Sequence, residues 1–240
     1  MKIRIKFRRF GTMKFLGHLD LMRYFQKAVR RAQIDICYSE GYSPHQIMSF
    51  AAPLGVGITS DGEYFDIEVN STMSTKQALE ALNATMVEGI EVTGYVALPD
   101  NAKTAMAIVA AADYRLTFKD GYESPCSVLE WQEHIQTLFT EQGSFTILKK
   151  TKKSEREVDL KPLVYNFSVA EDENGKPAFF LQVSTGSIDN IKPELVLASL
   201  YEKLGYIYDE RAIQIHRLEV YTRDDAGALV SLLALGTPVE

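Results

Sequence analysis

The residues best suited to acid–base or metal chemistry lie in two segments near the N-terminus. His18 and Asp20 open a stretch with helical spacing, and His45 belongs to the loop that follows it. If the start of this helix and the loop meet at one end of a sheet, two imidazoles and a carboxylate could bind a metal ion or exchange protons. The polar neighbours in the same two segments are Arg23, Ser39 and Ser43. His18, Asp20 and His45 are therefore the candidate catalytic residues.

A local role explains the same three residues without bringing distant segments together. An acidic group at the start of a helix stabilises the free backbone amides and the helix dipole, so His18 and Asp20 could serve the helix N-terminus. His45 could likewise form a hydrogen bond within the tight turn at Pro44. We favour this local interpretation because it needs no long-range coincidence.

Periodicity predicts a compact domain over residues 1–98. Residues 2–9 alternate between apolar and basic side chains, as a half-buried strand does, and residues 18–32 carry apolar side chains at helical spacing. A short apolar stretch then ends at Phe50, and the later elements are a strand over 63–69, a helix over 74–86 and a strand over 90–98. The order is βαββαβ, which is the order of a ferredoxin-like domain.

The second half repeats this pattern more loosely over residues 105–240. We predict strands near 107–118, 145–148, 163–169, 179–184 and 213–221, with helices near 128–139 and 193–204. Residues 149–161 are lysine-rich at their start and predict a mobile basic loop or a bent hairpin, and the tail from Asp224 predicts a closing hairpin. The expected fold is α+β, with two tandem ferredoxin-like domains built on antiparallel sheets.

Charge is distributed unevenly along the 240-residue chain, whose net charge is −6. The first 33 residues hold ten Lys and Arg and one acid, Asp20, which leaves 16 of the 26 basic and 31 of the 32 acidic side chains for the rest of the chain. The net charge argues against wholesale wrapping of nucleic acid. The basic N-terminal segment indicates either internal docking or an anionic partner.

The basic residues of this segment form two separate surfaces. On the first strand Arg4, Lys6 and Arg8 share one face, but the adjacent strand would place Tyr64, Asp66 and Glu68 opposite them, so cross-strand ion pairs should neutralise that face. On the first helix a stripe formed by Arg23, Lys27, Arg30 and Arg31 has only Asp20 nearby to offset it. This helical stripe is the better candidate for binding RNA or another anionic partner, although a charged face can also be merely solvated.

Four short stretches of the N-terminal half resemble the signature of a known family. They are Phe15-Leu16-Gly17-His18-Leu19-Asp20-Leu21-Met22-Arg23, Arg30-Arg31-Ala32, Tyr38-Ser39-Glu40-Gly41-Tyr42-Ser43-Pro44-His45 and Pro53-Leu54-Gly55-Val56-Gly57. Together they are similar to the radical-SAM-linked proteins, a domain of unknown function found alone or fused to cobalamin-type radical SAM proteins. The resemblance covers about residues 1–70 strongly and the second half weakly, and the family usually has Ser where this chain has Gly17 and Phe-Asn where it has Tyr42-Ser43. This resemblance implies a radical SAM protein as partner and a function related to RNA or translation. It supplies no catalytic residue.

Several chemistries are unsupported by the motifs present. A radical SAM enzyme holds its cluster through a CxxxCxxC run, whereas this chain has two cysteines, Cys37 and Cys126, 89 positions apart. Gly55-Val56-Gly57 is too short for a dinucleotide fingerprint, and no phosphate-binding GxxxxGK[ST] run occurs. The chain is therefore not a radical SAM subunit itself, and we expect no metal and no cofactor.

These observations predict an accessory binding protein of a radical SAM enzyme. It would bind RNA or the partner protein through the N-terminal domain, using Arg23, Lys27, Arg30, Arg31, Ser39, Tyr42 and Ser43. The alternative is an RNA-processing or hydrolytic enzyme that uses His18, Asp20 and His45. No apolar run reaches the length of a membrane helix and no signal peptide is recognisable, so we expect a cytoplasmic protein without a membrane partner.

Overall fold

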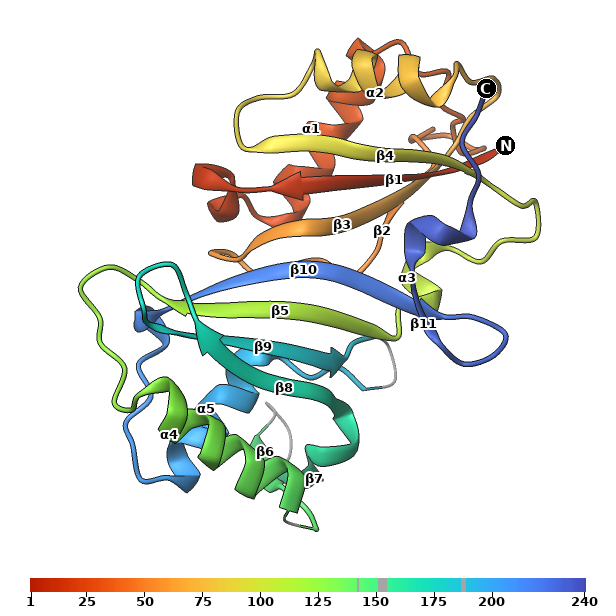
Figure 1. The fold of residues 1–240 in the computed structure, drawn as a ribbon. Coiled ribbons are helices and arrows are strands. Elements are labelled where there is room, and N and C mark those ends of the chain that lie inside the picture. The colour runs from red at the N-terminus through yellow and green to blue at the C-terminus, as the bar shows by residue number, and fades with distance from the viewer. Residues whose placement is uncertain (142, 151–154, 187–188) are drawn as a thin grey trace. The chain divides into compact units, whose positions relative to one another are not determined.

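The computed structural model describes residues 1–141, 143–150, 155–186 and 189–240. They form two compact units, which are considered separately (Figure 1). The first unit contains Met1–Ala110 together with Arg217–Glu240, and the second contains Ala111–His216. Strand β10 (Ile213–Arg223) begins in the second unit and continues into the first.

The first unit is a sheet with its two longer helices on one face. Its elements are β1 (Lys2–Arg9), α1 (His18–Arg31), β2 (Met48–Phe50), β3 (Thr59–Glu68), α2 (Thr75–Asn83), β4 (Ile90–Leu98), α3 (Ala105–Ile108) and β11 (Leu229–Ser231), with 3-10 turns at Gly11–Phe15 and Leu232–Leu235. The strand order is β4-β1-β3-β10, with β2 beside β3 and β11 beside β10. Strand β1 runs antiparallel to both β3 and β4.

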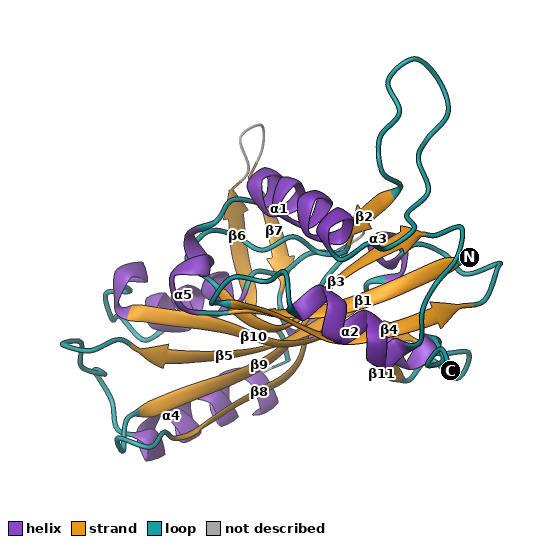
Figure 2. Ribbon diagram, turned by 90° about the horizontal axis from the view of Figure 1, so that it is seen from above, coloured by secondary structure: helices purple, strands orange, loops and turns teal. Residues whose placement is uncertain are grey.

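The core of this unit follows from two periodicities in the sequence. Alternation along β1 turns Ile3, Ile5 and Phe7 to one face, where all three are fully buried. Helix α1 presents Leu21, Phe25 and Val29 to the same core, and the Phe7 and Phe25 ring centroids are 4.6 Å apart. Figure 2 shows α1 and α2 lying over these strands, which leaves the outer side of α1 to solvent.

The second unit is also a mixed unit built on antiparallel strands. Its elements are β5 (Ala111–Phe118), α4 (Val128–Ile135), β6 (Thr146–Lys150), β7 (Glu155–Asp159), β8 (Val164–Glu171), β9 (Pro177–Ser184) and α5 (Pro193–Lys203). The strand order is β10-β5-β9-β8, and β6 pairs with β7 as a separate two-stranded sheet. Trp131 of α4 is fully buried, with its ring 5.3 Å from Phe179 and 5.1 Å from Tyr201.

The α+β class with mostly antiparallel strands agrees with the sequence prediction, but several boundaries differ. The predicted division into 1–98 and 105–240 put the C-terminus in the second domain, whereas residues 217–240 belong to the first unit. Antiparallel pairing of Ala97 with Thr237 and hydrogen bonds between Thr75 and Val239 hold them there. The strand predicted from residue 107 begins at Ala111 because Ala105–Ile108 forms α3.

Two further predictions concern the ends of elements. The predicted helix over 128–139 ends at Ile135 and continues as a π-helical turn over Gln136–Glu141. The hairpin alternative for the lysine-rich segment is confirmed by β6 and β7, while residues 151–154 lie outside the described residues. The predicted closing hairpin is also confirmed, because β11 pairs antiparallel with Tyr221–Arg223 of β10.

No helix in the described part of the chain combines the length and the apolar character of a membrane-spanning segment.

The close approach of β3 and β10 in the first unit gives a stability prediction. A Cβ added at Gly62 would lie 2.7 Å from the Cα of Glu219, so the strands must separate to admit even alanine. We expect Gly62→Ala to lower the free energy of unfolding by about 1–3 kcal/mol, the usual cost of overpacking. The matched control is Gly55→Ala, where the added Cβ meets only a side-chain atom at 3.8 Å. Urea unfolding of the two variants checks this, and equal stability would contradict it.

Candidate functional site

Two arginines of β1 are paired with acids on the neighbouring strands. Arg4 Nε and Nη2 donate to the two carboxylate oxygens of Asp66 at 2.8 and 3.0 Å. Arg8 donates to Asp61 at 2.7 Å and to Glu91 at 3.1 Å. The predicted opposition of Arg4 and Asp66 is confirmed by the strand register. These two arginines are therefore already neutralised.

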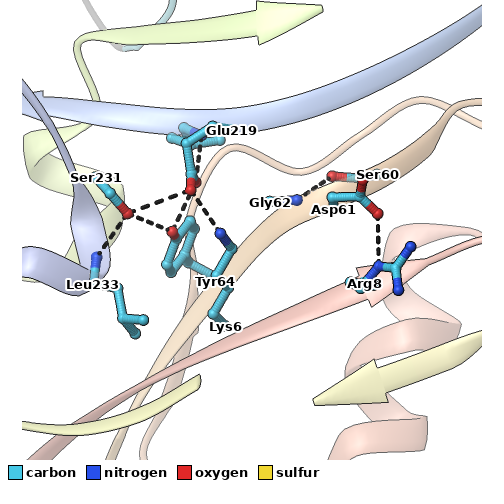
Figure 3. Close-up of polar contacts among 10 residues, drawn as sticks. Lys6, Arg8, Ser60, Asp61, Gly62, Tyr64, Glu219, Ser231 and Leu233 are labelled. Atoms are coloured by element: carbon cyan, nitrogen blue, oxygen red, sulfur yellow. Dashed lines mark hydrogen bonds and ion pairs between the residues drawn. The ribbon is translucent and has the colours of Figure 1, made fainter. Parts of the chain in front are cut away.

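Lys6 belongs to a polar network on the same face (Figure 3). Its Nζ donates to Glu219 Oε2 at 2.6 Å, and Tyr64 Oη donates to Glu219 Oε1 at 2.7 Å and lies 2.9 Å from Ser231 Oγ. Burial raises the pKa of Tyr64, and the charge of Glu219 raises it further, so the phenol stays neutral and acts as a donor. With only 1% of its surface exposed, Tyr64 cannot stack on a nucleobase.

The C-terminal segment covers this face of the first unit. Arg4 Nη1 donates to the carbonyl of Leu232, whose side chain is fully buried. A Cβ at Gly94 of β4 would lie 2.8 Å from Leu233, so β4 and this segment are in close contact. At Arg4 and Gly94 this sheet face is thus covered by the chain itself, in addition to being neutralised.

The helical stripe Arg23, Lys27, Arg30 and Arg31 is exposed along α1. Arg23 is 3.3 Å from Asp20, but both side chains are more than half exposed, so this ion pair contributes little. In the described parts of the chain the other three cations have no acidic partner. A groove of about 490 Å³ runs beside the stripe, and Met13, Leu16 and Val87 supply its apolar wall. This surface is the strongest anion-binding candidate of the first unit.

The three candidate catalytic residues have separate surroundings. The His18 ring makes an edge contact with Phe50 at 5.6 Å, Asp20 faces Arg23, and His45 Nδ1 lies 2.8 Å from Ser39 Oγ. No hydrogen bond or ion pair joins any two of the three, all of which are described. The shared site stays a prediction that these contacts do not support.

The local roles predicted for His18, Asp20 and His45 at the helix start and in the turn are seen in part. Asp20 lies in the first turn of α1, where a carboxylate interacts favourably with the helix dipole. Gly17 is the N-cap residue, and no side chain caps the helix there. His45 does take a local partner: its backbone amide donates to Ser39 Oγ at 3.1 Å, in addition to the ring contact.

The loop between α1 and β2 presents a second set of predicted binding residues. Ser39 N donates to the carbonyl of His45 at 2.8 Å, and Tyr38 pairs with Gln46, so the loop is closed at its base. Within it Tyr42 is fully exposed and Ser43 is exposed. Ser39 therefore shapes the loop, while Tyr42 and Ser43 face solvent.

A buried charge cluster in the first unit was missed by the sequence analysis. Arg9 Nε lies 3.0 Å from Glu63 Oε1, and Arg217 Nη2 lies 3.9 Å from Glu63 Oε2. The two arginines also donate to the carbonyls of Leu16 and Ala52, so they fix the start of α1 and the turn after β2. Burial raises the pKa of Glu63, and Arg217 and Arg9 oppose that rise. Strand alternation could have indicated that Arg9 is buried, because residue 9 lies on the same face of β1 as Ile3, Ile5 and Phe7.

No group of three or more His, Cys, Asp or Glu residues arranged to hold a metal ion occurs within the ranges that the structure describes. The exposed candidate surfaces of the first unit are the basic face of α1 and the loop that carries Tyr42 and Ser43.

The geometry defines a mixed α+β protein with an exposed basic helix. A family model described as "Uncharacterized protein conserved in bacteria (DUF2344)" matches residues 2–193, and the chain belongs to that family. The family model does not connect the chain with radical SAM proteins, so that part of the resemblance stays a prediction. No curated protein matches the chain.

Among solved structures, the chain is similar to one titled "Crystal Structure of a Cbf5-Nop10-Gar1 Complex". The identity is 11% and the TM-score 0.46, with 92% of this chain and 50% of that chain covered, so this chain spans about half the length of that one. A likeness at this level carries no functional inference.

The Arg4–Asp66 pair gives the next prediction. Arg4 is fully buried, so Asp66→Leu would leave its charge without a partner and should lower the free energy of unfolding by about 3–5 kcal/mol. The double variant Arg4→Met/Asp66→Leu removes both charges and should recover much of that loss. Chemical unfolding of both variants measures the difference. A single variant as stable as the unmodified chain would contradict the pairing.

Proposed function

We propose that this protein is an accessory RNA-binding protein that holds RNA phosphates on the outer face of α1. The observation that supports this most is the contrast between two basic surfaces of one segment. On β1, Arg4 and Arg8 are neutralised by neighbouring carboxylates, whereas Lys27, Arg30 and Arg31 on α1 have none in the described residues. Unpaired surface cations can release counterions from a polyanion on binding.

We also propose that each unit is a ferredoxin-like domain. The order β4-β1-β3 with β2 on the far side of β3, and the order β10-β5-β9-β8, support this assignment. In each unit one helix follows the first strand and another precedes the last. Such a fold hosts many functions, so the surface residues decide the activity.

The positions of His18, Asp20 and His45 support binding more than catalysis. A general acid or base must lie within hydrogen-bond reach, directly or through one water, of the proton that it transfers. Here Asp20 borders the α1 groove, whereas His45 lines a different pocket together with Met48 and Glu68. These positions support the binding hypothesis more than the hydrolytic or RNA-processing alternative.

We further propose that the partner protein is a radical SAM protein, recognised through the loop before β2. This proposal rests on the resemblance of residues 15–57 to the radical-SAM-linked proteins, and on the loop's geometry. The fully exposed ring of Tyr42, next to exposed Ser43, provides a specific surface on a base that Ser39 and His45 close.

Free cysteines, Cys37 and Cys126, fit the reducing cytoplasm in which we place the protein.

The RNA proposal predicts a change in salt dependence. Replacing Lys27 and Arg31 with Gln should weaken RNA binding, and should reduce the slope of log K against log salt by about 1.4–1.8, since each phosphate contact contributes about 0.7–0.9. Fluorescence anisotropy with a labelled RNA at several salt concentrations measures both quantities.

The control for this experiment is Lys76→Gln/Lys203→Gln, which removes the same charge from exposed positions on α2 and α5. It should leave the slope nearly unchanged. Equal effects of the two double variants would mean that net charge alone governs binding, and a curve indifferent to salt would reject phosphate binding.

The partner proposal predicts that Tyr42→Ala/Ser43→Ala reduces capture of the radical SAM protein by the full chain without changing stability. Both side chains are exposed, so folding should not depend on them. The control is Leu129→Ala, which also removes a large exposed side chain but lies on α4. A quantitative pull-down with thermal unfolding of each variant tests this. Undiminished capture by the loop variant would reject the loop as the docking site.

A further inference from the structure

The second unit contains a tyrosine-lined pocket between the end of α5 and the start of β10. Tyr201 is in the last turns of α5, and Tyr206 and Tyr208 follow on the segment that leads to β10. The Tyr206 and Tyr208 ring planes are tilted 71° and 78° to that of Tyr201, with centroids 6.3 and 5.4 Å from it. The pocket, here called the tyrosine box, has a volume of about 250 Å³ and is also lined by Tyr122. A single water occupies about 30 Å³ in the liquid, so a small organic group fits.

The charged groups of the tyrosine box have one sign. Among the described residues that line the box, the only charged side chains are those of Glu123 and Asp209. Each carboxylate has a cation outside the lining: Lys176 lies 2.8 Å from Glu123, and Arg211 lies 3.0 Å from Asp209. The lining itself therefore offers aromatic rings and two carboxylates, each paired with a cation outside it, and presents no cation to an incoming ligand.

Tyr208 lies in negatively charged surroundings, and its hydroxyl lacks a hydrogen-bond partner. Its hydroxyl oxygen is buried without a hydrogen-bond partner. Burial raises the pKa of Tyr208 to about 12, and the charges of Glu194, Glu210 and Asp209 add to the rise. The charges of these three carboxylates, unlike burial itself, also favour a cation in the box.

We propose that the tyrosine box binds an organic ammonium group of the trimethylammonium class. The faces of aromatic rings are the negative side of their quadrupole, and rings set at steep angles to one another surround a cation. A phosphate or carboxylate ligand would meet like charges at Glu123 and Asp209. A neutral apolar ligand would gain nothing from them.

The chain carries its own reporter for this binding. Trp131 is its only tryptophan, and its ring stacks on Tyr201 at 5.1 Å and contacts Tyr206 at 6.1 Å. A cation seated against Tyr201 or Tyr206 should therefore change the tryptophan emission. This readout needs neither RNA nor a partner protein, so its outcome is independent of the function proposed for α1.

The test is a fluorescence titration of the full chain with choline and with 3,3-dimethylbutan-1-ol, the uncharged analogue of the same shape. We expect saturable binding of choline, at least about fivefold tighter than that of the analogue, as a cation–π contribution predicts. A peptide with trimethyllysine, compared with its unmodified form, tells whether a peptide side chain is also accepted. Equal affinity for choline and the alcohol, or no response to either choline or the trimethyllysine peptide, would overturn the proposal.

Variants at Tyr206 assign the binding to the box. The side chain is partly exposed, so its replacement should not prevent folding. Tyr206→Phe keeps the ring and should retain choline binding, whereas Tyr206→Leu should weaken it about fivefold or more. Tyr42→Leu removes a fully exposed tyrosine in the first unit and serves as the control. Unchanged affinity in Tyr206→Leu, measured by calorimetry, would overturn the assignment.

Discussion

The buried pair of Arg4 and Asp66 is the interaction on which the first unit most depends. Arg4 is fully enclosed, and its guanidinium also donates to the carbonyl of Leu232, while Asp66 accepts from the amide of Ala105 at 2.6 Å. One ion pair therefore connects β1, β3, α3 and the C-terminal segment. Because a buried charge without a partner is strongly unfavourable, these four segments must assemble together. The same pairing neutralises Arg4, whereas the cations of α1 stay exposed.

Sequence periodicity was sufficient to predict β1, α1, β3, α2 and β4 of the first unit. Alternation over residues 2–9 places Arg4 opposite Asp66 once β1 and β3 are neighbours, and the register confirms it. The basic face of α1 was predictable for the same reason, since helical spacing alone separates Arg23, Lys27 and Arg30 from the buried side of the helix. Periodicity succeeds here because each inference involves one element or one pair of adjacent strands.

Long-range pairing could not be read from local patterns. The assignment of residues 217–240 to the first unit depends on β10 and β11 and on the contacts of Thr237 and Val239, which join positions more than a hundred residues apart. The cluster of Arg9, Glu63 and Arg217 likewise depends on contacts between distant parts of the chain. For His18, Asp20 and His45, residue type indicated possible chemistry but not geometry, and each side chain has a different neighbour. Tyr201, Tyr206 and Tyr208 were also unremarked in the sequence, because only the packing of α5 against the following segment sets their angles.

We propose that RNA contacts α1 rather than the sheet face of the first unit. Photochemical crosslinking of the full chain to RNA that contains 4-thiouridine, followed by mass spectrometry of the crosslinked peptides, distinguishes the two surfaces. We expect crosslinks within His18–Arg31 and its groove neighbours Met13, Leu16 and Val87. Crosslinks confined to Lys2–Arg9 or to Ala111–His216, with none in α1, would contradict it.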